Sequence, residues 1–540
     1  MAGLGPSNSK EKLIAFLESP ESYPHRPTEV RAIQTHISWV FLASPFVFKV
    51  KKPVNLGFLD FSTLEKRHYF CQREIELNRR LAPEVYRGVV PVYKTASGFS
   101  FNGEGEIVEY AVKMKELAHG FFLNELLDKN RVGENEISRV ISSLHRFYQA
   151  ETPTPEIERW GTPKKLKIST DENFAQVQPF VDKTISSAAF EVIRHYTNQF
   201  YILSENLFQE RIQLHRILDC HGDLHLDHVH LTPEATTIFD CIEFNDRFRF
   251  IDIANDLGFL AMDFDFKGRS DLGNLFLRNA AHELGDAGML KVANFYKCYR
   301  AFVRGKVESI QATEKETANP QEHEKQAARY FRLALRYTTA GSQPLILAVM
   351  GRIGAGKSTI AKRLASELNW PVFSSDETRK TLVGVPLNQR TPPKVRDKVY
   401  SRQMTQRTYR KLVEHGLGAL RKNHGAILDA TFSSRALRKV LRDECNKANV
   451  PFQCVELEAD PNEIKKRLQG RDEKTAEGSD ARLEDFDKLN ASYEPPSELA
   501  PDLIRVSTRT SIADAVKAIL LSLVEKQTLV ANNVRSSKHG

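Results

Sequence analysis

The chain has 540 residues, of which 41% are hydrophobic and 27% are charged, and its formal net charge is +8 at pH 7. This composition excludes a disordered class, and the length predicts two or three domains. No apolar run is long enough to span a bilayer, and the N-terminus lacks the apolar stretch of a secretory signal, so we expect a cytoplasmic protein without membrane partners. The six cysteines have neither C-x-x-C nor zinc-ligand spacing, which favours reduced, buried thiols.

The first predicted elements are a short helix at residues 10–19 and a hairpin. We assign residues 1–29 to an N-terminal helix and loop, because Pro and His residues interrupt any regular pattern there. Residues 35–42 and 46–50 are two apolar runs separated by a short turn containing a proline. This pattern predicts a β-hairpin.

A lysine on this hairpin is the first candidate functional residue. Lys49 and Lys51 lie two apart, so they point to the same face of the predicted strand. A capping-box pattern then begins a predicted helix at residues 62–81, which contains Glu74. A strand lysine followed by a helix glutamate is the ion pair that holds ATP phosphates in protein-kinase-like folds. We therefore take Lys49 and Glu74 as candidate ATP-binding residues.

A predicted strand at residues 107–114 runs into residues 115–118, which we interpret as a hinge between two lobes. Adenine would lie against this hinge, beside Met114. Helical periodicity follows at residues 137–148 and again at residues 185–216.

The segment His-Gly-Asp-Leu-His at residues 221–225, followed by Ile-Phe-Asp at residues 238–240, resembles the catalytic loop and metal-binding segment of the aminoglycoside phosphotransferase and choline kinase family. The resemblance implies a bilobal α+β protein-kinase-like domain, which we assign to residues 30–337. It also implies that Asp223 orients or deprotonates a substrate hydroxyl and that Asp240 binds Mg²⁺ beside ATP.

One position departs from the family pattern. The resemblance implies an asparagine as the second metal ligand, and this chain has His228 there. Imidazole matches the oxygen-seeking Mg²⁺ poorly, so His228 is a candidate ligand for weakly held Mg²⁺ or for a softer metal, or else binds no metal. A zinc site is the less favoured interpretation of the histidines, since further ligand spacing is missing. A glycine-rich loop between the first two strands is also missing.

Composition predicts the boundary to the next domain. Helical residues 292–338 are followed by a linker-like stretch at residues 338–344. We therefore expect a second domain at residues 345–525 and a flexible tail at residues 526–540. This arrangement resembles uncharacterised bifunctional proteins that join a phosphotransferase-like domain to an ATP-binding domain.

The second domain begins with a phosphate-binding signature. The sequence after an apolar strand matches G-x-x-x-x-G-K-[ST], and a helical pattern follows it. Glycines allow backbone N–H groups to close on phosphate oxygens, while the lysine and serine reach the terminal phosphates and Mg²⁺. The candidate ATP-binding residues are Gly351, Arg352, Ile353, Gly354, Ala355, Gly356, Lys357, Ser358 and Thr359.

Further strands are predicted at residues 370–374, 425–428 and 452–457, alternating with helices. This order predicts a doubly wound parallel sheet, whose ligands lie at the carboxyl ends of the strands. Asp376 and Asp429 both follow such ends. Either could serve only as a helix cap.

The pattern resembles P-loop kinases of small molecules and polynucleotides, including zeta-toxin-like proteins. The resemblance implies that Asp376 is the base for the acceptor hydroxyl and that Asp429, with Ser358, holds Mg²⁺. Arg467 and Arg471 lie four apart on a predicted helix and resemble lid arginines that neutralise the transferring phosphate, with Arg482 as a further candidate. A solvated basic face is the alternative for each arginine.

Together these features predict a two-site phosphotransferase that uses ATP and Mg²⁺ to phosphorylate small-molecule hydroxyls. One alternative is a regulatory protein with a degenerate N-terminal kinase domain and a single active P-loop domain. Another is a kinase of nucleic-acid ends, which the positive charge permits without favouring it.

Overall fold

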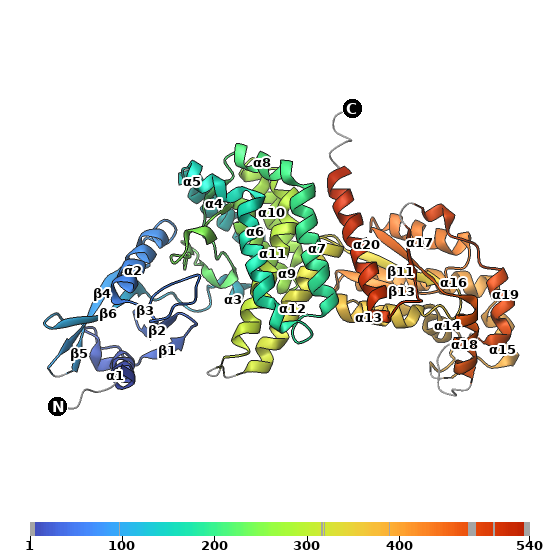
Figure 1. The fold of residues 1–540 in the computed structure, drawn as a ribbon, viewed down its shortest axis with the longest axis horizontal. Helices are drawn as coiled ribbons and strands as arrows, with labels where there is room; N and C mark the ends of the chain where they lie inside the picture. The colour runs from blue at the N-terminus through green and yellow to red at the C-terminus, as the bar shows by residue number, and fades with distance from the viewer. Residues whose placement is uncertain are drawn as a thin grey trace. The chain divides into compact units, whose positions relative to one another are not determined.

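The computed structural model describes residues 6–96, 98–314, 317, 319–387, 389–472, 482–500 and 503–533. The chain forms two compact units, Met1–Ile168 with Glu205–Tyr296, and Ser169–Ser204 with Lys297–Gly540. The second unit thus takes residues 169–204 and 297–337, which the sequence-based division assigns to the N-terminal domain. The reason is packing, because helices α7 (Ser187–Leu203) and α12 (Pro320–Thr339) both contact α20 (Ile512–Asn533) near the C-terminus (Figure 1).

The first unit begins with an antiparallel sheet in the order β1-β2-β3-β6-β4-β5. The predicted hairpin forms, with Val40 opposite Lys49 and Trp39 opposite Val50. Phe48 and Val50 lie in a buried apolar cluster with Trp39, so the alternation of the strand turns the lysines to the other face. The strands are β1 (Arg31–Gln34), β2 (Ser38–Ala43), β3 (Phe46–Lys51), β4 (Tyr86–Thr95), β5 (Gly98–Ser100) and β6 (Glu106–Lys115).

Helix α2 (Leu64–Asn78) packs on β4 and β6. It begins where the sequence predicts, because the side chain of Thr63 accepts a hydrogen bond from the backbone N–H of Lys66. The helix packs Cys71 and Ile75 in an apolar cluster with Tyr86 and Val112 of the sheet, and Glu74 is buried as well. Helix α1 (Pro6–Glu18) contributes Leu17 to the cluster on the other face of the sheet.

The rest of the first unit is mainly helical, and two short strand pairs hold the loop predicted to be catalytic. Strands β7 (Ile217–Asp219) and β10 (Phe250–Asp252) pair, as do β8 (Val229–Leu231) and β9 (Thr236–Ile238). Helix α9 (Ile253–Phe266) is buried along almost its whole length. The other helices are α3 (Leu123–Asp128), α4 (Glu134–Ala150), α5 (Pro155–Glu158), α8 (Glu205–Gln213) and α10 (Ser270–Glu283), while α6 (Pro163–Val177) and α11 (Met289–Gln311) run from one unit into the other.

The second unit contains a parallel sheet in the order β12-β13-β11-β14-β15. Strand β11 is fully buried, and its alternate residues Ile346, Ala348 and Met350 lie in an apolar cluster with helices α16 (Arg402–Ala419) and α17 (Arg435–Lys447). The predicted strands form, and β15, which the sequence reading missed, adds an edge. The strands are β11 (Leu345–Gly351), β12 (Val372–Ser374), β13 (Gly425–Asp429), β14 (Phe452–Glu458) and β15 (Leu503–Ser507).

Helices connect these strands in the order expected of a doubly wound sheet. Helix α13 (Lys357–Leu368) packs against α20 as well as against β11 and β13. Helix α20 continues to Asn533, past the point at residue 526 where the sequence predicts a tail. The remaining helices are α14 (Ser375–Val383), α15 (Pro393–Val399), α16 (Arg402–Ala419), α17 (Arg435–Lys447), α18 (Pro461–Asp472) and α19 (Phe486–Ala491). Across the described ranges, every helix is too short or too polar to cross a membrane.

Candidate functional site

The glycine loop of the second unit joins β11 to α13 and has the geometry of a phosphate cradle. Gly351 and Gly354 have φ of +139° and +70°, where side chains are rarely tolerated. A Cβ atom at Gly351 would lie 2.6 Å from the carbonyl oxygen of Leu457, and one at Gly354 would lie 2.8 Å from Cγ2 of Ile464. The loop therefore requires glycine, and it leaves the N-terminal N–H groups of α13 available to an anion.

Lys357, Ser358 and Asp429 lie together at this loop. Nζ of Lys357 donates to the carbonyl oxygen of Arg352 over 2.9 Å. Asp429 ends β13, is 6% exposed and hydrogen-bonds Ser358. Burial raises the pKa of the Asp429 carboxyl, although Lys357 and the Ser358 hydrogen bond partly offset the shift. A serine hydroxyl beside a carboxylate is a donor set suited to Mg²⁺ with nucleotide phosphates.

Asp376 lies in the first turn of α14, directly after the neighbouring strand β12, and shares a cavity with these residues. Ser374 is paired in register with Asp429, and its hydroxyl accepts from the backbone N–H of Asp376 over 3.2 Å. The cavity has a volume of about 530 Å³, and Lys357, Asp376 and Asp429 all line it. The arrangement brings a phosphate cradle and a carboxylate into one cavity large enough for a small ligand.

The three candidate lid arginines have different surroundings. Arg467 donates to Oγ1 and the carbonyl oxygen of Thr508 over 3.3 and 3.4 Å. It also borders the glycine loop, because a Cβ atom at Gly356 would lie 3.8 Å from its Nη1. The side chain of Arg471 lies outside the described residues. Arg482 lies 3.4 Å from Glu484 and is not among the residues that line the cavity.

The sequence reading missed Arg379, which lines the same cavity. Its side chain is 5% exposed and donates to the carbonyl oxygen of Val399 over 2.9 Å and to Oγ1 of Thr405 over 3.2 Å. Nε of Arg379 is buried without a hydrogen-bond partner among the described residues. The spacing from Asp376 to Arg379 is one helical turn, which is the signal that could have identified it.

In the first unit, Lys49 and Lys51 both contact Glu74. Nζ of Lys49 lies 3.0 Å from Oε1 of Glu74 and 2.6 Å from Oδ1 of Asp240. Nζ of Lys51 lies 2.6 Å from Oε2 of Glu74 and also binds Glu243. The sequence reading selected only Lys49. The alternation of β3 explains why both lysines reach the same carboxylate.

These charges stabilise one another in a buried setting. Burial opposes the charge of Lys49, but Asp240 and Glu74 outweigh that effect and hold its pKa well above the usual value. Burial likewise opposes the charge of Glu74, yet the two lysines lower the pKa of its carboxyl. Lys49, Lys51, Glu74 and Asp240 therefore remain charged at neutral pH. The ammonium of Lys49 lies beside the carboxylate of Asp240.

The loop at residues 221–228 is held by Asp256. The carboxylate of Asp256 accepts from the backbone N–H groups of His221 and Gly222 over 3.0 and 2.9 Å, and from the hydroxyl of Tyr148 over 2.9 Å. Gly222 has a φ of +85°, and a Cβ atom there would lie 2.8 Å from the carbonyl oxygen of Phe248. The start of the loop is therefore fixed, and the next residue, Asp223, has a 36% exposed side chain.

His228 lies between Asp223, which was predicted to be catalytic, and Asp240, which was predicted to bind Mg²⁺. Its Nε2 is 3.4 Å from Oδ2 of Asp240, and its Nδ1 is 3.6 Å from Oδ2 of Asp223. Burial lowers the pKa of His228 to about 4, so its imidazole is neutral at pH 7. A neutral imidazole is a nitrogen donor, which Mg²⁺ does not favour. The donor set around Asp240 thus does not fit the Mg²⁺ that the family resemblance implies.

Met114 lies near the end of β6, opposite Val47 and Tyr86. It packs, partly buried, against the cluster that contains Tyr86 and Val112. Its assignment to adenine binding stays a prediction.

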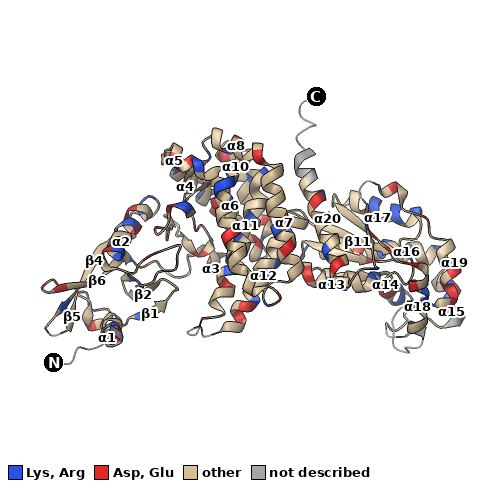
Figure 2. Ribbon diagram, viewed as in Figure 1, with Lys and Arg blue, Asp and Glu red and all other residues tan. Residues whose placement is uncertain are grey.

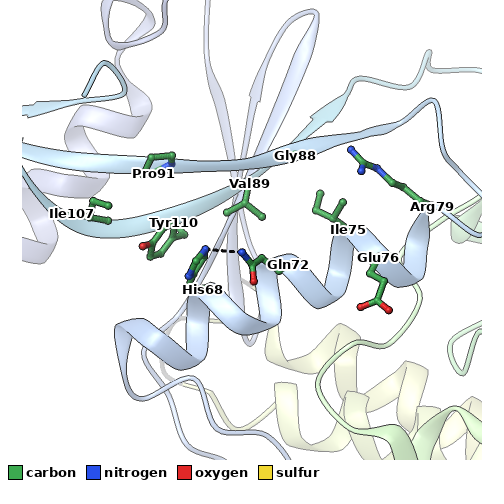
Figure 3. A pocket seen from close by; sticks show the side chains of 10 residues that line it. All are labelled: His68, Gln72, Ile75, Glu76, Arg79, Gly88, Val89, Pro91, Ile107 and Tyr110. Carbon is green, nitrogen blue, oxygen red and sulfur yellow. Dashed lines mark hydrogen bonds between the residues drawn. The ribbon is translucent and has the colours of Figure 1, made fainter. Parts of the chain in front are cut away.

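A separate groove of about 780 Å³ lies on the face of the first sheet that α2 covers, between α2 and strands β4 and β6 (Figure 3). The ring of His68 stacks on Tyr110 with centroids 4.0 Å apart, and Nε2 of His68 is 3.0 Å from Nε2 of Gln72. Glu76 and Arg79 complete its polar side. The residues predicted for ATP or metal binding all lie elsewhere.

Comparison with known proteins agrees with this geometry in the second unit. Residues 346–496 match the family described as an AAA domain. The match, the parallel sheet and the glycine loop define a P-loop kinase-like domain. A gluconokinase of Gluconobacter oxydans (strain 621H) is 28% identical over 141 residues, which cover 25% of this chain and 70% of that protein.

Longer relatives extend over both units. An uncharacterised protein of Mycobacterium tuberculosis (strain ATCC 25618 / H37Rv) is 32% identical over 450 residues, covering 82% of this chain and 87% of its own. A protein of Mycobacterium bovis (strain ATCC BAA-935 / AF2122/97) gives the same figures. The chain belongs to the family of these mycobacterial proteins. Among solved structures, a gluconokinase from Sinorhizobium meliloti 1021 is similar with a TM-score of 0.25 and 18% identity, covering 36% of this chain and 98% of that one.

Proposed function

We propose that the second unit is an ATP-dependent kinase that transfers the γ-phosphate to a hydroxyl group of a small molecule. The observation that carries this proposal is the shared cavity, in which the phosphate cradle at Lys357 and the carboxylate of Asp376 line the same space. The similarity to a gluconokinase over 141 residues supports the class of reaction. Phosphoryl transfer needs positioning and charge neutralisation more than covalent chemistry by the protein.

Each residue then has a separate task. Lys357 and the N-terminal N–H groups of α13 bind the ATP phosphates, while Ser358 and Asp429 hold Mg²⁺, which neutralises phosphate charge when bound. Asp376 accepts the proton of the acceptor hydroxyl. Arg467, at the edge of the glycine loop, adds positive charge near the transferring group.

Arg379 suggests what the acceptor carries. Its guanidinium lines the cavity and has a buried Nε without a partner among the described residues. An unpaired buried donor is costly, and an anionic group on the acceptor would satisfy it. We therefore favour acceptors that bear a carboxylate or phosphate besides the hydroxyl.

The test is ATP-dependent phosphorylation of a library of hydroxylated carboxylates and phosphates by the full chain. Lys357→Ala is expected to abolish the transfer, whereas Lys411→Ala, which removes an exposed lysine of α16, should leave it intact. Transfer that survives Lys357→Ala at the wild-type rate would refute the assignment.

For the first unit we propose a bilobal kinase-like fold with an ATP site of its own. The contacts of Lys49 with Glu74 and Asp240 support this proposal, since they match the ion pair and metal carboxylate of such kinases. ATP binding by the Lys357→Ala chain tests it, because that variant leaves only the first site. Residual binding that Lys49→Met removes is the expected result, and no residual binding would contradict it.

The nucleic-acid alternative rests on local charge. Helix α17 carries Arg435, Arg438, Lys439, Arg442 and Lys447 (Figure 2). Arg438 is buried and paired with Glu498, which weakens the case for a binding face. Salt-sensitive retention of an oligonucleotide would favour this alternative, because phosphate contacts weaken steeply with salt.

A further inference from the structure

The residues around Asp223 offer a mixed nitrogen and oxygen donor set. One donor atom each from Asp223, His225 and His228 can be chosen so that all three lie within 4.8 Å of one another. Nε2 of His225 is 3.6 Å from Oδ2 of Asp223. Ligand atoms of a tetrahedral zinc site with bonds of about 2.1 Å lie about 3.4 Å apart, so small side-chain movements suffice to close the group on one ion.

The second nitrogen of each histidine already has an oxygen neighbour. Nδ1 of His228 is 2.9 Å from the carbonyl oxygen of Asp223, and Nδ1 of His225 is 3.5 Å from Oδ2 of Asp227. Metal-binding histidines usually donate their second N–H to a carbonyl or carboxylate, which fixes the ring and leaves the other nitrogen for the metal. That pattern leaves Nε2 of His228 as a donor. Nδ1 of His225 accepts from the backbone N–H of Asp227 over 3.4 Å, so its ring must turn this nitrogen to the Asp227 carboxylate before Nε2 binds a metal.

The local charge and burial also suit a cation. The side chains of His225 and His228 are 8% and 14% exposed, while Asp223 is 36% exposed and leaves a path for an ion. The carboxylates of Asp223, Asp227 and Asp240 surround the rings, and Lys49 contacts that of Asp240. A donor set of two imidazoles and a carboxylate is preferred by zinc-like divalent metals rather than by Mg²⁺.

We propose that the first unit holds a transition-metal ion of the zinc and cobalt class at Asp223, His225 and His228, in place of the Mg²⁺ that the kinase resemblance implies. The inference rests on the proposed kinase-like function of the first unit only in taking Mg²⁺ as the metal that is replaced. It has a consequence for the chemistry of the site, because a carboxylate that ligates a metal is not available as a base for a substrate hydroxyl. When the metal is bound, the first unit is a regulatory module, and the second unit catalyses phosphate transfer.

The experiment is cobalt binding by the full chain, freed of metal with a chelator and kept without ATP or acceptor. Visible absorption of Co²⁺ reports its coordination number, and titration gives the stoichiometry. The variants are His225→Gln and His228→Asn. The matched control is His215→Asn, which removes a 66% exposed histidine paired with Glu158. Circular dichroism confirms that each variant is folded.

We expect one Co²⁺ per chain with a four- or five-coordinate spectrum, displaced by an equimolar amount of Zn²⁺ but not by a roughly 1,000-fold excess of Mg²⁺. The signal should be lost in His225→Gln and His228→Asn and kept in His215→Asn. A wild-type chain without the spectrum, a spectrum that both variants retain, or ready displacement by Mg²⁺ would overturn the inference. Because ATP is absent, these results are independent of whether either unit transfers phosphate.

Discussion

Lys51 and Glu74 form a fully buried ion pair in the first unit, with Nζ 2.6 Å from Oε2. Lys49 holds the other oxygen of the same carboxylate, and its side chain is 12% exposed. The two lysines therefore have different roles. Lys51 is the structural partner that also binds the buried Glu243, and Lys49 is the one placed to meet a ligand beside Asp240.

Lys51→Met should destabilise the first unit by about 3–5 kcal/mol, because it leaves the carboxylates of Glu74 and Glu243 buried with one cation fewer. Hydrogen exchange of the α2 and β3 amides measures this loss locally. Lys94→Met, at an exposed position of β4, is the control and should leave exchange unchanged. Equal protection in the two variants would show that Lys51 is not structural.

Arg379→Lys should raise the KM for the acceptor by about 10- to 100-fold, since a charge-assisted hydrogen bond contributes about 1.5–3 kcal/mol. The kcat should change much less, because Arg379 binds the acceptor and does not take part in the transfer. Steady-state kinetics with an active acceptor provides the measurement, with Arg435→Lys on the exposed start of α17 as the control. A fall in kcat at unchanged KM would assign Arg379 to the transfer step instead.

The ion pair of Arg438 and Glu498 predicts a pH dependence of stability in the second unit. Nε of Arg438 donates to Oε1 of Glu498 over 2.5 Å, and this hydrogen bond lowers the pKa of the carboxyl. A lowered pKa stabilises the fold above the pKa of the unfolded chain, and this contribution is lost as the pH falls through the folded-state pKa. Glu498→Gln should thus cost about 1.5–3 kcal/mol at pH 7.

The difference between wild type and Glu498→Gln should shrink below about pH 4.5 and vanish once Glu498 is protonated. Urea unfolding at a series of pH values measures it. Glu463→Gln, at a 50% exposed position of α18, is the control and should show little difference at any pH. A cost for Glu498→Gln that is constant with pH would mean that packing, and not charge, holds this residue.

The sequence identifies the phosphate cradle well because the cradle is local. Gly351 to Thr359 lie next to one another in the chain, and the glycines are required by the backbone itself. The same holds for the order of strands and helices around them. Strand β15 escaped notice because it has only five residues and begins with two adjacent apolar ones, so its sequence does not alternate strictly.

Residues that meet through tertiary packing were harder to predict. Arg379 lies one helical turn after Asp376, but this spacing becomes a signal only if residues 375–383 are predicted as a helix, and helix α14 was not predicted from the sequence. Lys51 was passed over because a strand pattern gives the face of a side chain but not the partner that reaches it. The burial that lowers the pKa of His228 could not be predicted either, since it depends on the packing of separate segments, including the one that carries Asp240.

Asp376→Asn removes the carboxylate that we propose as the base for phosphate transfer in the second unit. Transfer of labelled γ-phosphate from ATP to an acceptor should fall by about 10²- to 10⁴-fold in this variant, with ATP affinity unchanged. Asp443→Asn, at an exposed position of α17, should transfer phosphate at the wild-type rate. Wild-type transfer by Asp376→Asn, or loss of ATP binding together with transfer, would contradict the assignment.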